Sequence, residues 1–264
     1  MKVDAHVHIW DTRFKPHKEH PLPPIQATAT DLLANMDKAN VQKAVIVQPI
    51  NYKFNHDCIT TAVKQHPHRF VAVALMDSTL PAQQACSTLQ TLVQQHDFRG
   101  FRINPTFTAD GFANECVHAL TDCAAKLDVP VTLFARPQHV DDVTKLVQQH
   151  AQSKIIVDHF GFVDSKESRE RLLYLSRYGN VYVKVSAWFR VSSQRWPHKD
   201  VHELLSDLIG AYGAHRLLLG SDYPFVKQEY SYQDAMNVVH QVDKVCEKDK
   251  QWMCGDTASV LYKL

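Results

Sequence analysis

Short apolar runs rich in β-branched residues recur along the chain, and the gaps between them are long enough for helices. Several runs are almost continuously apolar, as is typical of strands buried on both faces of a parallel sheet. Eight can be distinguished, at residues 3–9, 43–48, 70–76, 100–103, 131–134, 154–157, 181–185 and 216–219. The pattern therefore predicts eight strands that run parallel to one another.

The segments between these runs have the spacing of amphipathic helices. Thr30 and Asp31 are capping residues, and Leu32, Leu33 and Met36 then share one helical face. The same spacing recurs at residues 114–127, 139–150, 168–178 and 200–212. Eight strands alternating with helices over about 250 residues match a closed (β/α)₈ barrel, the TIM barrel. We therefore predict an α/β fold with a single barrel domain that spans residues 1–264.

An open, doubly wound sheet is the competing α/β architecture. Its first strand is normally followed by a glycine-rich turn that binds phosphate. Here the first strand leads into His-Val-His-Ile-Trp-Asp, and the chain holds only 8 glycines, so a dinucleotide-binding fold is disfavoured. Two irregular stretches, residues 10–28 and 188–199, follow the first and seventh strands, and we expect loops that cover a substrate there.

Composition narrows the possible partners. The 29 basic and 28 acidic residues leave a net charge of +1, which provides no electrostatic reason to expect nucleic acid or an anionic membrane surface. No apolar run approaches the ~20 residues of a membrane span. The six cysteines form no C-x-x-C pair, so we expect reduced thiols in a cytoplasmic protein. The expected partner is a small-molecule substrate, and the sequence is silent on oligomeric state.

Polar residues at the ends of the predicted strands are the candidates for chemistry, because the C-terminal ends of barrel strands converge on one mouth. The first strand ends in His6-Val7-His8, and residues two apart on a strand point to the same side, with roughly 6–7 Å between their Cα atoms. Both imidazoles can therefore face one ion or one substrate. A second copy of the motif, His66-Pro67-His68, precedes a strand, so we expect it on the opposite face in solvent.

Two further strand ends carry candidate residues. His159 follows the apolar sixth run, and Asp222 follows three leucines and precedes Pro224. Each has a structural alternative: His159 could be a core histidine bonded to a backbone carbonyl, and Asp222 could cap the following turn.

Taken together, these motifs resemble a known family. The chain is similar to the amidohydrolase-2 branch of the amidohydrolase superfamily, and most similar to its sugar-lactonase and pyrone-dicarboxylate-lactonase group. The likeness covers essentially the whole chain and includes the tail, Gly-Asp-Thr-Ala-Ser-Val-Leu-Tyr at residues 255–262. The resemblance implies a barrel whose mouth hydrolyses esters, lactones or amides, or in some branches decarboxylates aromatic acids.

The resemblance also implies site residues and bears on the cofactor. His6, His8 and Asp222 match the family's metal or substrate cluster, and His159 matches its sixth-strand histidine. Metal-dependent relatives usually supply another histidine after the fifth strand, where this chain reads Val-Thr-Leu-Phe-Ala-Arg. Three ligands suffice for a catalytic zinc in general, but lactonases of the resembled group can work without a metal. We therefore favour a site that requires no cofactor, with one Zn or Mn ion on His6, His8 and Asp222 as the alternative.

Other strand-end residues are candidates for substrate binding. Arg102 lies in a Gly-Phe-Arg stretch similar to Gly-Val-Arg in these lactonases, and a guanidinium can hold a carboxylate with two hydrogen bonds. For the remaining candidates an ion pair at the rim or simple packing is the alternative. They are the cations Lys184, Arg190 and Arg136, and the pocket candidates Gln48, Trp10, Tyr223 and Phe225.

The leading hypothesis is hydrolysis of a small, anionic lactone or related ester. Asp222 would accept a proton from water as general base, and the three histidines would polarise the carbonyl and hold the oxyanion. Arg102 would orient the carboxylate of the substrate. The alternatives are metal-dependent decarboxylation of an aromatic or unsaturated acid, a catalytically silent barrel used for binding, and a metal-dependent nuclease, which the net charge of +1 disfavours.

Overall fold

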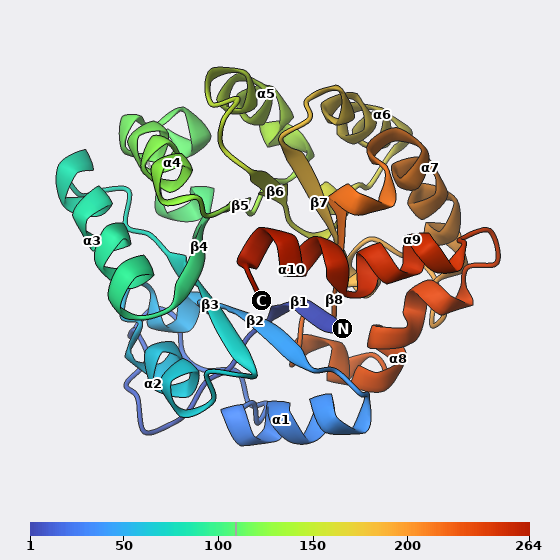
Figure 1. Ribbon diagram of the computed structural model, residues 1–264, viewed down its shortest axis with the longest axis horizontal. Helices are drawn as coiled ribbons and strands as arrows, with labels where there is room; N and C mark the ends of the chain where they lie inside the picture. The colour runs from blue at the N-terminus through green and yellow to red at the C-terminus, as the bar shows by residue number, and fades with distance from the viewer. Residues whose placement is uncertain (109) are drawn as a thin grey trace.

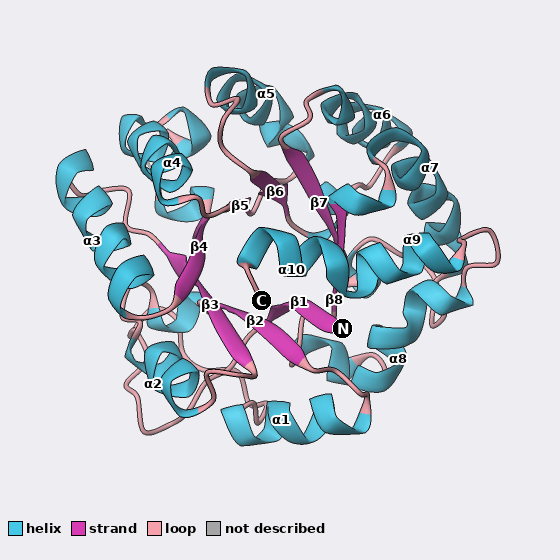
Figure 2. Ribbon diagram, in the orientation of Figure 1, coloured by secondary structure: helices cyan, strands magenta, loops and turns pink. Residues whose placement is uncertain are grey.

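Eight parallel strands form one continuous sheet in chain order, and helices alternate with them around the outside (Figures 1 and 2). The computed structural model describes residues 1–108 and 110–264. The strands are β1 Val3–Val7, β2 Lys43–Val47, β3 Phe70–Leu75, β4 Phe98–Ile103, β5 Val131–Leu133, β6 Ile155–Val157, β7 Val181–Ser186 and β8 Leu217–Gly220.

Backbone contacts between the ends of β1 and β8 close this sheet into a barrel. Val7 forms a parallel bridge with Tyr223, which follows β8. The His8 amide donates to the Tyr223 carbonyl at 2.6 Å, and the Asp222 amide donates to the His6 carbonyl at 2.9 Å. The predicted single-domain (β/α)₈ barrel is confirmed.

The helices lie close to their predicted positions. Those named in advance are α1 Ala29–Lys38, α4 Glu115–Leu127, α5 Val140–Gln149, α6 Lys166–Tyr174 and α7 His202–Tyr212. The sixth is shorter than predicted because its last turn tightens into a 3₁₀ turn at Leu175–Arg177, a common ending for a helix. The others are α2 Asp57–Gln65, α3 Ala82–Gln95, α8 Tyr232–Asn237, α9 Glu247–Gln251 and α10 Thr257–Tyr262.

The last helix seals the N-terminal end of the barrel. In Figure 1, α10 lies across the centre of the ring of strands. Its buried residues Ala258, Leu261 and Tyr262 belong to the same apolar cluster as the residues that fill the barrel interior. Those interior residues include Val3, Ala5, Val45, Val71, Ile156 and Leu218. With this end packed, only the end at which the strands' C-termini meet can hold a substrate.

A bulge in β1 decides which way its histidines face. Val3 and Ala5 belong to the interior cluster, whereas Val7 belongs to the apolar layer between the sheet and the helices. The register of β1 against β2 shifts between Asp4 and Val7, so the alternation of side chains is reversed after the shift. His6 and His8, on the opposite side from Val7, therefore turn into the barrel.

No helix among the described residues combines the length and the apolar character needed to cross a bilayer.

Candidate active site

The histidines and the aspartate selected from the sequence meet at the mouth of the barrel. The His6 ring lies 4.9 Å from that of His8 and 4.5 Å from that of His159, measured between centroids. Asp222 Oδ1 lies 3.8 Å from His6 Nε2 and 3.6 Å from His8 Nε2. All four side chains are buried, so their interactions are little weakened by solvent.

The backbone around Asp222 is held in an unusual conformation. Its φ is +60°, in the left-handed region that costs non-glycine residues free energy. The chain can come this close to β1 because Gly220 has no side chain: a Cβ there would lie 2.9 Å from the Cβ of His6. Buried Asp4 adds support, since its carboxylate accepts from the amides of His6, at 3.1 Å, and Ser221, at 2.9 Å.

A chain of hydrogen bonds assigns the protons on the first-strand histidines. His8 Nδ1 lies 2.7 Å from the carbonyl of Val47, which can only accept, so Nδ1 carries the proton. His8 Nε2 is then an acceptor for His6 Nε2–H at 3.2 Å, and His6 Nδ1 in turn accepts from Lys184 Nζ at 3.2 Å. Burial, followed by the charge of Arg102, lowers the pKa of His8 to about 3. Burial, followed by the charge of Lys184, holds the pKa of His6 well below its ordinary value, so both rings are neutral at physiological pH.

Asp158 anchors a buried ion cluster that the sequence analysis did not select. Its carboxylate lies 3.1 Å from Lys184 Nζ and accepts from Arg102 Nε at 2.9 Å. Although burial opposes ionisation, the charges of Lys184 and Arg102 hold the pKa of Asp158 well below its usual value. Strand alternation could have identified Asp158. Ile156 faces the barrel interior, and a residue two positions later on the same strand is expected to face the same way.

Asp222 is in a different electrostatic environment from Asp158. Burial raises the pKa of Asp222 to about 6, and the opposing charges of Arg190 and Arg102 offset this only in part. Arg190 Nε donates to Asp222 Oδ2 at 2.7 Å from the partly exposed rim. The two carboxylates thus have pKa values pushed in opposite directions, a pattern found where one group is fixed as an anion and the other exchanges protons.

A cavity of about 250 Å³ opens above this cluster. It is smaller than the roughly 300–1,000 Å³ typical of sites for drug-sized ligands, so it suits a substrate of about one ring. Its walls include six of the predicted residues: Arg102, Arg190, His8, His159, Asp222 and Phe225. The sequence analysis did not select its other lining residues, Pro49, Ile50, Asn51, Asn104, Thr106 and Phe134.

Five predicted substrate-binding candidates do not line this cavity. Arg136 lines a separate small hollow, with its guanidinium carbon 5.0 Å from the Phe162 ring. Lys184 is buried below it in the Asp158 cluster. Gln48 donates to the carbonyls of Lys53 and Asn55, and so shapes the loop after β2. Trp10 Nε1 donates to the Ile25 carbonyl in the loop after β1, and buried Tyr223 closes the barrel.

The donor atoms at the mouth fit a divalent metal. Zinc at 2.0–2.1 Å from tetrahedral ligands holds them about 3.4 Å apart. His6 Nε2, His8 Nε2 and Asp222 Oδ1 are separated by 3.2, 3.6 and 3.8 Å. His6, His159 and Asp222 offer a second set of ligand atoms, all within 4.8 Å of one another. The Val47 carbonyl on His8 Nδ1 is the kind of outer partner that metal-bound histidines have.

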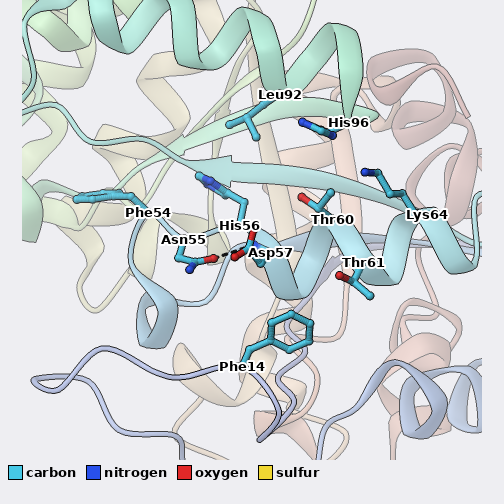
Figure 3. A pocket seen from close by; sticks show the side chains of 10 residues that line it. All are labelled: Phe14, Phe54, Asn55, His56, Asp57, Thr60, Thr61, Lys64, Leu92 and His96. Carbon is cyan, nitrogen blue, oxygen red and sulfur yellow. Dashed lines mark hydrogen bonds between the residues drawn. The ribbon is translucent and has the colours of Figure 1, made fainter.

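A larger hollow, of about 750 Å³, lies elsewhere, between α2 and α3 (Figure 3). Figure 3 shows Thr60 and Lys64 of α2 facing Leu92 of α3 and His96, which directly follows that helix. His56 lies at its base, where burial lowers the pKa of the ring to about 4 and Nε2 lies 3.2 Å from the Leu75 carbonyl. None of the residues that line it comes from the ion cluster, so we do not assign the chemistry to this hollow.

Comparisons with known proteins identify the family and the fold of this chain. Residues 3–264 match the family model described as amidohydrolase. A 4-sulfomuconolactone hydrolase from Rhizobium radiobacter is 24% identical over 230 residues, which cover 84% of this chain and 75% of the relative.

Solved structures share the fold. A probable 2-pyrone-4,6-dicarboxylic acid hydrolase from Acinetobacter baumannii, with citric acid bound, superimposes with a TM-score of 0.84 at 19% identity, covering 100% of this chain and 99% of the other. An amidohydrolase from Burkholderia multivorans with bound zinc gives 0.82 at 17% identity, with coverage of 100% and 99%.

Proposed function

Because this chain belongs to the amidohydrolase family, we propose that it hydrolyses a small, anionic lactone or a related ester at the barrel mouth. One observation carries the proposal: Asp222, with a raised pKa, shares a one-ring cavity with two arginines, Arg102 and Arg190. The lactone-hydrolysing relative and the citrate-bound structure support both the bond type and the anionic substrate.

In the proposed reaction, Asp222 takes a proton from a water molecule as the water oxygen bonds to the carbonyl carbon. Negative charge then develops on the carbonyl oxygen. His159 is suited to hold it: if the Ser186 hydroxyl donates to His159 Nδ1, 2.9 Å away, Nε2–H is free to donate into the cavity that His159 lines. The ring C–O bond then breaks, and protonated Asp222 returns its proton to the departing oxygen, which leaves an open-chain hydroxy acid.

The hydrogen bonds support narrower roles for the first-strand histidines. The single lone pair of His8 Nε2 accepts from His6 Nε2–H, so His8 cannot donate to an oxyanion. His6 makes no wall of the cavity and connects His8 to Lys184. We therefore assign His8 to the wall of the cavity beside Asp222, and His6 to positioning His8.

Arg102 is placed to bind the carboxylate of the substrate. Its Nε is used by Asp158, and the residue also lines the cavity, so its terminal N–H groups remain for a ligand. Asp158 and the Phe134 ring, 4.8 Å from the guanidinium carbon, fix its orientation. Because these protein contacts fix the guanidinium group, its remaining N–H groups are well suited to orient an anion.

We favour a reaction without a resident metal. Inward-facing positions of β5 and its end carry Thr132 and Phe134 rather than a further ligand, and Arg190 already engages Asp222. If a metal is bound, His6, His8 and Asp222 would hold it, and it would polarise the carbonyl or acidify a bound water. The zinc-bound structure of a family member keeps this alternative open for test.

The test is hydrolysis by chelator-treated protein of a panel of carboxylated five- and six-membered lactones. We expect turnover that survives chelation and is lost in Asp222→Asn. Near-stoichiometric zinc or manganese, with activity lost on chelation, would contradict the metal-free mechanism. Release of CO₂ from an aromatic acid by the metal-loaded protein, with no lactone hydrolysed, would establish the decarboxylase alternative instead.

We also propose that the protein works in the cytoplasm on a dissolved substrate. All six cysteines are free thiols, which supports a reducing compartment.

A further inference from the structure

A second hollow lies beside the mouth cavity, between the loops that follow β7 and β8. It measures about 550 Å³, roughly twice the volume of the mouth cavity. Residues 189 and 192–196, together with His198, form one wall, and Glu229 and Tyr230 form the other. Because both segments follow the C-terminal ends of their strands, the hollow opens at the same end of the barrel as the proposed active site.

Arg190 separates the two spaces. Its guanidinium carbon lies 5.1 Å from the Phe189 ring, which lines the second hollow, and 5.3 Å from the Phe225 ring, which lines the mouth cavity. The same guanidinium is bonded to Asp222. A ligand that reached from Asp222 to the second hollow would therefore pass over Arg190, which is partly exposed at the rim.

The walls of this hollow suit a ring. Trp196 and Tyr230 lie 5.0 Å apart with 38° between their planes, and the ring of His198 lies 5.0 Å from that of Tyr230. Phe189 packs edge-on against Tyr230 at 6.4 Å. Flat aromatic faces grouped in this way bind the faces of other rings through dispersion and burial of apolar surface.

A buried acceptor in the same wall lacks a partner. His198 is only 3% exposed, and its Nδ1 lies 2.8 Å from the carbonyl of Gln194. Since a carbonyl can only accept, the proton of neutral His198 is on Nδ1 and its Nε2 is a bare acceptor. Within the described residues, Nε2 has no hydrogen-bond partner. Buried polar atoms are normally paired, so a donor brought by a ligand would remove a cost already present in the free protein.

Hydrogen bonds within the loop that carries these residues hold it in one conformation. Asp200 accepts from the Ser192 hydroxyl at 2.5 Å and from the amide and hydroxyl of Ser193 at 2.8 and 3.0 Å. His198 adds its bond to Gln194. A wall already ordered in this way loses little conformational freedom when a ligand binds.

We propose that this hollow is a second compartment of the substrate site, which holds a hydroxyl-bearing ring attached to the lactone. The aromatic faces of Trp196 and Tyr230 stack on the ring, and His198 Nε2 accepts from its hydroxyl group. The mouth cavity takes the lactone and the second hollow takes the appended ring. This inference rests on the lactonase function proposed above.

The experiment compares a carboxylated lactone with the same lactone bearing either a glycosyl or a hydroxyphenyl substituent. We expect wild-type protein to show a higher kcat/KM for one of the extended lactones than for the parent, and the better substituent identifies the ring. Trp196→Ala should lower the ratio of extended to parent kcat/KM about tenfold, the effect of losing one stacked face. Trp252→Ala, a half-buried tryptophan far along the chain at η12 (Trp252–Asp256), is the matched control and should leave the ratio unchanged.

A second variant keeps the test decisive if Trp196→Ala does not fold. Gln194→Trp leaves the aromatic wall intact and fills the hollow from its exposed side, so it should abolish the preference for the extended lactone. Calorimetric binding of both lactones to Asp222→Asn measures the preference without turnover. An equal affinity for parent and extended lactones overturns the second compartment even if the parent is hydrolysed, whereas failure to hydrolyse either overturns the proposed function first.

Discussion

The motif His-x-His occurs twice in this chain, at opposite ends of barrel strands. His6-Val7-His8 ends β1, and both rings are buried among Asp158, Lys184 and Asp222. His66-Pro67-His68 follows α2 and precedes β3, with His66 half-buried against Phe70 and His68 exposed. The residue types and spacing are identical. Direction along the strand, rather than the motif, decides whether two imidazoles enter a low-dielectric cluster or contact solvent.

Removing the charge of Asp222, which lies at the C-terminal end of the barrel strands, should produce the largest loss of activity. Asp222→Asn keeps the shape but cannot accept a proton, so we expect kcat to fall by about 10³-fold, within the range for loss of a general base. Steady-state kinetics on the preferred lactone measure this. Asp128→Asn is the control at the N-terminal end, where Asp128 pairs on the surface with Lys154 and Lys263, and full activity is expected. Equal losses in both variants would remove the distinction between the two ends.

Breaking a Lys–Asp pair should also have unequal effects at the two ends. Lys184→Met leaves Asp158 buried with one fewer counter-charge, so the free energy of unfolding should fall by about 3 kcal/mol. Lys154→Met removes an exposed pair with Asp128 and should cost less than about 1 kcal/mol. Urea denaturation followed by circular dichroism compares the two. A Lys184→Met protein as stable as wild type would mean that Asp158 is not ionised in the folded state.

The pH dependence should identify Asp222 as a buried group. Its pKa is raised to about 6, so the base form needed for catalysis is present above that pH. The value of kcat/KM should therefore fall about tenfold for each pH unit below about 6, rather than below the usual carboxyl value of about 4. A pH–rate profile of the chelator-treated enzyme tests this. A kcat/KM that stays constant down to pH 5 would show that burial does not raise the pKa of the base.

The smallest effects should come from the second histidine motif. His66→Ala and His68→Ala, singly or together, should change the free energy of unfolding by no more than about 0.5 kcal/mol, since they alter half-buried and exposed side chains. Their kcat/KM should match that of wild type. A large loss of activity in either variant would indicate that the two ends of the barrel are coupled in a way the contacts do not show.

The sequence predicted the barrel well because its signals are local and repeated. Apolar runs mark every strand, and Asn114 caps α4 where that helix was predicted to begin. At α1 the predicted cap was wrong by two residues: Thr28 is the N-cap, Thr30 lies inside the helix, and only Asp31 takes part in the capping box. The convergence of His6, His8 and Asp222 followed from strand direction alone. Their roles in catalysis or metal binding stay predictions, as do the domain limits.

What the sequence could not reveal depends on contacts between distant segments. Lys184 was selected as a substrate-binding residue, but its partner Asp158 is 26 positions away, and only the closed barrel shows that they neutralise each other. Gln48 and Trp10 were selected for the pocket, yet their hydrogen bonds go to loop carbonyls whose positions depend on tertiary packing. Propensity and periodicity carry no information about such partners.

The bulge in β1 makes the length of that strand more constrained than its composition. The extra residue between Asp4 and Val7 sets the phase in which the following side chains alternate. Without the bulge, regular alternation over the same number of residues would send both histidines toward the helices and bring Val7 to the mouth. Exchanging one apolar residue of β1 for another leaves this phase unchanged, whereas one residue inserted between His6 and His8 would place the two imidazoles on opposite faces of the strand.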